Sequence, residues 1–177
     1  MRKLLKSLMG DIDLQVPAPP QQLFQALVDA MARRRGETIE LRMASFPEGT
    51  NLTGVVVELK DRHLIVVEAD TPPEHQLVIL GHELWHLHAG HCIHGLPGSA
   101  AAQAYDSTLD PAELATVVAA RTQFEENRES EAEVFGYRLG AACRGWLAGT
   151  PAARSPIRLN EVGGRINASL GYHGPQG

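Results

Sequence analysis

The sequence has little of what marks secreted, membrane-spanning or nucleic-acid-binding proteins. Only two of its 177 residues are cysteines, too few for a disulfide framework, which favours a reducing compartment. No stretch approaches the roughly 18 consecutive apolar residues of a membrane span, and the basic N-terminal stretch lacks the apolar core of a signal peptide. The formal net charge of −5 argues against a body that binds nucleic acid. We therefore expect a soluble, cytoplasmic protein.

One short stretch, residues 81–87, carries the clearest chemistry because it contains His-Glu-x-x-His. Residues four apart on an α-helix lie about 40° apart on one face, so His82 and His86 can direct both imidazoles at one Zn²⁺. Glu83, on the flank of that face, is placed to accept a proton from a water molecule at the open position of the metal. The motif predicts a catalytic zinc site, and the alternative is a buried helix whose two histidines are merely satisfied polar groups.

The residues around the motif have the signals of a buried helix. Thr71-Pro72-Pro73-Glu74 is typical of a capping box, with Thr71 as the N-cap and Pro72 at the first helical position. We therefore predict a helix that runs to about Gly90. An apolar stripe roughly opposite the histidines consists of Leu77, Leu80, Leu84 and Leu87.

Other potential metal ligands follow the motif without forming a recognised pattern. A metzincin would need a glycine and a third histidine where this sequence has Ala89 and Cys92. His88, His91 and His94 match no closed zinc site, and nothing supplies the other half of one. We interpret them as helix-end and surface residues.

Upstream of the motif, the pattern predicts a helix over 20–35 followed by a small sheet. The basic run at Arg33–Arg35, followed by glycine, is more typical of a helix end than of a nucleic-acid contact. Residues 38–43, 52–59 and 63–68 are predicted strands, the last two joined by a short hairpin. We expect an α+β fold in which a small antiparallel sheet of about three strands packs against the motif helix and further helices.

The remaining boundaries follow from composition and capping signals. We expect residues 1–19 to form an N-terminal arm, 20–150 to form one domain, and 151–177 to be a partly irregular extension. Capping boxes at Asp110 and Thr122 predict further helices.

The predicted helix over about 123–147 carries the third ligand candidate. Its apolar stripe includes Phe135, and one turn before it lies Glu131. A carboxylate on the core face needs a partner, and a zinc ion held by two histidines is one. We therefore predict Glu131 as the third zinc ligand, with Glu129 and Glu133 as alternatives. The predicted stripe consists of Phe135, Leu139, Ala142 and Trp146.

The order of these motifs resembles the ImmA/IrrE family of bacterial metallopeptidases, which belong with the gluzincins. Members carry a strand and turn before a His-Glu-x-x-His helix, here residues 65–71 and 80–86. They also carry a downstream Glu-Ala-x-x-Phe-Ala-like helix, here residues 131–136. The resemblance covers roughly residues 20–147 and implies a minimal zincin-like fold.

Carried over to this sequence, the resemblance implies that His82, His86 and Glu131 bind zinc and that Glu83 is the general base. Two features depart from the family pattern. Trp85 stands where members usually have a small residue, which would narrow the cleft. The interval between the second histidine and the downstream glutamate is long, which implies an inserted loop or helix.

The family also implies a substrate class. Such proteins typically cleave or inactivate a helix-turn-helix repressor made by a neighbouring gene, which releases stress, mobile-element or toxin–antitoxin genes. We therefore expect a zinc endopeptidase that acts on a DNA-binding regulator supplied in trans, without itself contacting nucleic acid or membrane. Two alternatives stay open: a metal-bearing module that acts by binding its partner without proteolysis, and a toxin enzyme neutralised by an antitoxin.

Overall fold

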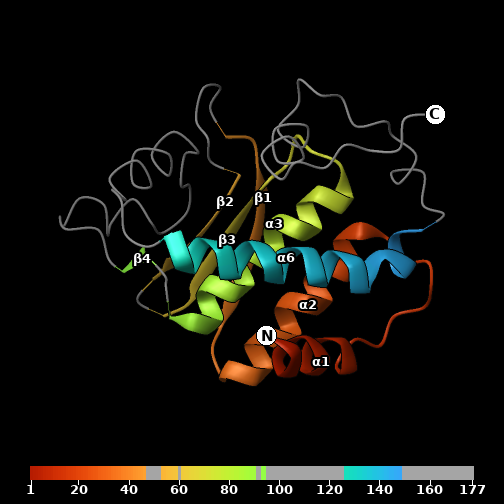
Figure 1. Cartoon of the computed structure of the whole chain (residues 1–177), viewed down its shortest axis with the longest axis horizontal. Coiled ribbons are helices and arrows are strands. Elements are labelled where there is room, and N and C mark those ends of the chain that lie inside the picture. The colour runs from red at the N-terminus through yellow and green to blue at the C-terminus, as the bar shows by residue number, and fades with distance from the viewer. Residues whose placement is uncertain (47–52, 60, 91–92, 95–125, 149–177) are drawn as a thin grey trace.

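The computed structural model describes residues 1–46, 53–59, 61–90, 93–94 and 126–148 (Figure 1). These residues form a mixed α and β structure, as expected for an α+β protein. No helix in these ranges is long and apolar enough to cross a membrane. The helices are α1 (Arg2–Gly10), α2 (Pro20–Arg35), α3 (Pro73–Ala89) and α6 (Glu126–Leu147), and the strands are β1 (Ile39–Ala44), β2 (Gly54–Glu58), β3 (His63–Glu68) and β4 (Ile93–His94).

The sheet is mixed, so the prediction of an antiparallel sheet is wrong. Its strand order is β1-β3-β2-β4. The predicted hairpin of β2 and β3 is present and antiparallel, but β1 pairs with β3 in the parallel sense. Strand β3 takes a central place because every one of its residues is buried, whereas most of β1 is only partly buried. A strand with no exposed face packs best between two neighbours.

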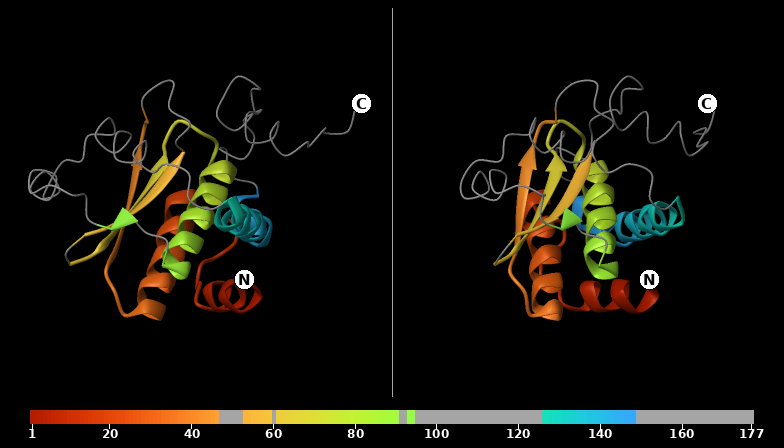
Figure 2. Two further views of the ribbon diagram at one scale, coloured as in Figure 1. Left: turned by 60° about the vertical axis from the view of Figure 1, so that its left-hand side comes forward. Right: turned by 90° about the vertical axis from the view of Figure 1, so that its left-hand side faces the viewer.

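The helices of the described part lie on one side of the sheet, with α3 between the sheet and α6 (Figure 2). Side chains alternate along β3: Ile65 and Val67 join the main core under the helices, while Leu64 and Val66 join a smaller cluster on the opposite face. The helix that carries the motif is therefore covered on two sides, as predicted. Its leucines at 77, 80, 84 and 87 are all 1% exposed or less.

Residues 1–19, predicted to form an N-terminal arm, pack against the rest of the described molecule. Helix α1 buries Leu4 and Leu8 in the main core. The stretch after it runs along the end of α6, where the indole of Trp146 donates a hydrogen bond to the Leu14 carbonyl and the Ala18 amide donates one to the Trp146 carbonyl. These contacts hold the C-terminal half of α6.

The ends of α3 differ slightly from the predicted ones. The helix begins at Pro73 with Pro72 as N-cap, and no side chain caps it. The predicted capping box does not form, the helix begins one residue later than predicted, and the Thr71 hydroxyl lies 3.5 Å from His75 Nδ1. At the other end Gly90 adopts φ 72°, a left-handed conformation that glycine adopts without strain, and ends the helix as predicted.

The arginine run has structural partners within the chain. Arg35 donates a 2.8 Å hydrogen bond to the Leu87 carbonyl near the end of α3. Arg34 reaches the Ser7 hydroxyl, and Arg33 reaches the Asp11 carbonyl. These contacts support the helix-end interpretation of the run. Two predicted segments lie outside the described residues: the helix that begins at Asp110 and the extension 151–177. Of the helix predicted to begin at Thr122, only the part from Glu126 onward, which is α6, is described.

Candidate metal centre

Helix α3 brings the two motif histidines together, as the i, i+4 spacing predicts. The Nε2 atoms of His82 and His86 are 2.8 Å apart, and their ring centroids are 4.5 Å apart. The His86 side chain is 1% exposed and that of His82 is 23% exposed. Both rings therefore direct a ligand nitrogen at one point while one of them stays open to solvent.

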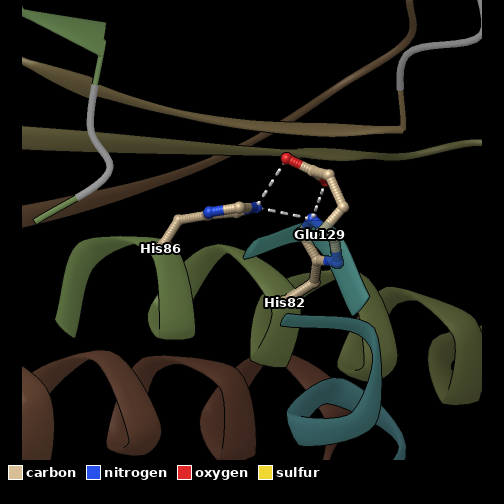
Figure 3. A group of neighbouring side chains, drawn as sticks. All are labelled: His82, His86 and Glu129. Carbon is tan, nitrogen blue, oxygen red and sulfur yellow. Dashed lines mark hydrogen bonds and ion pairs between the residues drawn. The ribbon is translucent and has the colours of Figure 1, made fainter. Parts of the chain in front are cut away.

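Glu129, near the start of α6, completes the group (Figure 3). Its Oε2 lies 3.3 Å from His82 Nε2, and its Oε1 lies 3.5 Å from His86 Nε2. Ligand atoms of these three residues all lie within 4.8 Å of one another, which makes them a group that can hold a metal ion. Glu129 was an alternative in the sequence-based prediction, not the first choice.

Glu131 is exposed and is not part of this group, so the prediction that it lies on the core face of the helix is wrong. The predicted stripe stepped back from Phe135 by four residues, whereas the buried face steps back by three, to Ala132. Ala142, placed in the stripe, is exposed, and Cys143 is buried in its place. Glu129, three residues before Ala132, then falls on the side of the helix that meets α3. The buried positions of α6 include Ala132, Phe135, Leu139, Cys143 and Leu147.

Two glycines allow α3 and α6 to touch backbone to backbone beside the histidines. A Cβ added to Gly81 would lie 2.8 Å from the Cα of Gly136. A Cβ added to Gly136 would lie 2.5 Å from the Val78 carbonyl oxygen. Because neither glycine has a side chain, the two helices can cross at this short distance. The close crossing lets Glu129 reach His82 and His86.

Glu83, the predicted general base, is buried between α3 and the sheet. It is 4% exposed, and its carboxylate lies against the start of β2. A Cβ added to Gly54 would lie only 2.9 Å from Glu83 Oε1 and 2.6 Å from Cγ2 of Ile79. The missing side chain at position 54 therefore makes room for the carboxylate.

Gly54→Ala is expected to destabilise the fold by about 1–3 kcal/mol, because the added methyl group overpacks the contact with Glu83 and Ile79. Urea unfolding measures this change, and zinc affinity should stay within a few fold because the atoms nearest the added Cβ belong to Ile79 and Glu83, neither of them a proposed ligand. Gly145→Ala is the matched control, since a Cβ there meets nothing within 4 Å. Equal unfolding free energies for the two variants would contradict the contact.

The Glu129 carboxylate and the His82 imidazole shift each other's pKa. Hydrogen bonds to His82 and then to His86 hold the pKa of Glu129 well below its usual value. Burial lowers the pKa of His82, but the hydrogen bond to Glu129 and the charges of Glu83, Glu129 and Glu133 outweigh it, so the net shift is upward. Without metal, the raised pKa favours a proton on His82, and a metal ion must displace that proton.

In the metal-free protein this pairing is expected to stabilise the fold over a limited pH range. The Glu129 pKa lies below its usual 4.5, so its contribution is complete above pH 4.5 and is lost as the pH falls through the lowered pKa. The His82 pKa lies above 6.5, so its contribution is complete below pH 6.5 and is lost as the pH rises through the raised pKa.

The stability difference between wild type and Glu129→Gln should therefore be largest between pH 4.5 and 6.5. For a pair this exposed it should not exceed about 1 kcal/mol. Urea unfolding with a chelator present measures it across the pH range. A difference that grows as the pH rises above neutrality would contradict the assignment.

The three side chains fit zinc better than they fit a harder cation. Two imidazole nitrogens and one carboxylate oxygen are a donor set of catalytic zinc sites, which leave a fourth position open. Tetrahedral coordination at about 2.0–2.1 Å places ligand atoms about 3.3 Å apart. The two distances to Glu129, 3.3 and 3.5 Å, already match, and the 2.8 Å between the imidazoles is shorter. Metal entry thus requires the two rings to separate by about half an ångström.

Among the described residues, Trp85 and His88 do not join this group. Trp85, expected to narrow a cleft, is 8% exposed and belongs to the core, with its ring 5.3 Å from that of Phe135. His88 is exposed, and its ring centroid lies 5.5 Å from that of Trp85. His91 and Cys92 lie outside the described residues, and only the backbone of His94, in β4, is described.

Comparisons of the chain with protein-family models, curated proteins and solved structures gave no match. The case for a function therefore rests on the residues of the site and on their geometry.

Proposed function

We propose that this protein is a zinc-dependent endopeptidase that acts on a protein substrate. The observation that carries the proposal is the convergence of His82, His86 and Glu129 from two helices, with ligand atoms within 4.8 Å of one another. The buried Glu83 follows the first histidine directly in the chain. Two histidines, a carboxylate and an adjacent glutamate are the parts of a hydrolytic zinc site.

Each side chain has a defined role in this chemistry. A zinc ion held by these residues would lower the pKa of a bound water molecule to about 7 and would polarise the scissile carbonyl. His82 and His86 bind through Nε2, so both must be unprotonated when the ion is bound. Glu83 accepts the proton of the attacking water and delivers it to the leaving amine. Its burial between α3 and β2 limits the motion of its carboxylate.

The resemblance to the ImmA/IrrE family supports a more specific substrate class. We propose that the substrate is a DNA-binding regulator of the helix-turn-helix or antitoxin type, supplied in trans in the cytoplasm. The motif helix and the downstream acidic helix occur in the expected order and contact each other. The proposed third ligand is Glu129, which lies two residues before the predicted Glu131 in that helix. Both are glutamates, so the proposed chemistry is unchanged.

Glu83→Gln tests the proposal because it keeps the shape of the side chain and removes its basicity. The variant should bind zinc within a few fold of wild type and lose about 10²–10⁴-fold in peptidase rate. It should therefore capture an uncleaved partner in a pull-down from cells, and zinc-loaded wild type should cleave that purified partner. The protein instead acts by binding alone if Glu83→Gln relieves repression in cells as well as wild type does. Growth arrest by the wild type expressed alone would indicate the toxin alternative.

A further inference from the structure

The crossing of α3 and α6 is tighter than the packing of ordinary side chains allows. A Cβ at Gly136 would meet the Val78 carbonyl oxygen at 2.5 Å and the His82 amide nitrogen at 3.3 Å. A Cβ at Gly81 would meet the backbone of Gly136 at 2.8 Å and the side chain of Leu139 at 3.1 Å. Backbone atoms cannot rotate away as a side chain can, so any added atom must push the two helices apart.

This crossing lies beside the metal group on both helices. Gly81 directly precedes His82 in α3. Gly136 follows Glu129 by seven residues, which is nearly two turns, so the two lie about 20° apart on the same side of α6 and about 10 Å apart along it. A displacement of α6 at Gly136 is therefore carried to Glu129 by a continuous helix.

Within the described part of the chain, the Glu129 side chain is held by the two histidines. Its side chain is 52% exposed, and the polar contacts of its carboxylate among the described residues are those with His82 and His86. Its distance from the histidines therefore depends on how closely α6 approaches α3. The close approach is in turn set by the two glycines.

We propose that Gly81 and Gly136 are positioning residues for the metal centre, because their crossing sets the distance between Glu129 and the two histidines. This inference rests on the metal-binding part of the proposed function and does not depend on peptidase activity. Relieving the 2.5 Å contact to an ordinary van der Waals distance of 3.4 Å moves α6 by close to an ångström. Metal–ligand distances tolerate only about ±0.2 Å, so a shift of this size weakens the third ligand.

Gly136→Ala in the full chain tests the inference. Gly140→Ala is the matched control, since its Cβ meets only the Val78 Cγ2 at 3.0 Å, and Gly145→Ala is an open control with nothing within 4 Å. Zinc affinity is measured by competition with a chelator, and the melting temperature of each metal-free variant is measured separately. Gly136→Ala should bind zinc at least about tenfold more weakly than wild type, which is the size of effect seen when a residue that orients a metal ligand is lost. It should also change the visible absorption bands of cobalt bound in place of zinc. Both controls should stay within threefold of wild type.

A lower melting temperature for Gly136→Ala with zinc affinity and cobalt bands like those of Gly140→Ala would overturn the inference, because the glycine would then serve packing alone. If Gly136→Ala does not fold, Gly81→Ala approaches the same crossing from α3 and carries the same expectation. Failure of wild type to bind zinc would overturn this inference together with the metal centre. Intact zinc binding without peptidase activity in the wild type would count against the proposed function alone.

Discussion

Replacing His82 or His86 with alanine is expected to abolish zinc binding. Each change removes one of two nitrogen ligands whose Nε2 atoms now lie 2.8 Å apart. The loss should exceed the roughly 100-fold that removal of an outer partner costs, because a ligand itself disappears. Zinc at about 100 times its Kd should raise the stability of wild type by about 2.7 kcal/mol and leave both variants unchanged. Metal analysis after gel filtration and thermal melting with and without zinc measure the two effects.

His88→Ala is the matched control for this experiment because His88 is an exposed histidine on the same helix. It should keep one equivalent of zinc and the full thermal shift. Full zinc occupancy in both the His82→Ala and His86→Ala variants would show that the ion binds elsewhere in the chain. Melting of the metal-free variants separates loss of a ligand from loss of the fold, which matters most for the buried His86.

Glu129→Gln is expected to weaken zinc binding severely, whereas Glu131→Gln should leave it within a few fold. The carboxylate of Glu129 lies 3.3 and 3.5 Å from the two ligand nitrogens, and the amide of glutamine supplies a weaker, neutral donor. Glu131 is exposed on the same helix and is therefore a control that matches the removed charge. Chelator competition on the three proteins gives the affinities, and we expect at least about a 100-fold difference between the two variants.

Glu133→Gln is expected to have a small effect on zinc binding, smaller than that of Glu129→Gln. The charge of Glu133 raises the pKa of His82, but Glu133 is not among the residues whose ligand atoms converge. The variant should therefore shift the pH dependence of zinc binding slightly and leave the affinity near pH 7 within a few fold. If Glu131→Gln lost the metal while Glu129→Gln kept it, the helical register that the structure gives for α6 would be wrong.

The motif half of the site could be predicted from sequence because it is local. The positions of His82, Glu83 and His86 on one helix depend only on the 3.6-residue period and on the absence of a strong helix breaker. The leucine stripe that covers the other side of the helix depends on the same period, and all its members are buried. Only the first residue of the helix was misplaced, by one position.

The third ligand depends on a contact between helices that are far apart in the sequence, so periodicity alone could not choose it. Ala132 and Ala142 are both small and apolar, yet the first is buried and the second exposed. The signal that distinguishes them is Cys143, which continues the buried face and was not counted as apolar although cysteine is often buried. Counting Cys143 and the buried Leu147 in place of Ala142 and Trp146 turns the centre of the face by about 50°, away from Glu131 and towards Glu129.

The sheet order was missed for a related reason. The strand pattern of a sequence predicts which neighbouring segments pair through a short hairpin, as β2 and β3 do. It does not predict the order of the strands in the sheet, here that β3 lies between β1 and β2. The clue available in the sequence was the uninterrupted apolar run of β3, which is typical of a strand covered on both faces. The resulting β1–β3 pairing is parallel because the chain reverses direction twice between those strands.

X-ray absorption at the zinc edge of the zinc-loaded protein tests the central claim most directly, since it reports the atoms around the ion without reference to activity. The His82–His86–Glu129 assignment predicts one zinc ion with nitrogen and oxygen neighbours at about 2.0–2.1 Å and the scattering pattern of two imidazoles. That pattern should fall to one imidazole or vanish in His82→Ala. A sulfur neighbour at about 2.3 Å would instead place a cysteine such as Cys92 on the metal and contradict the assignment.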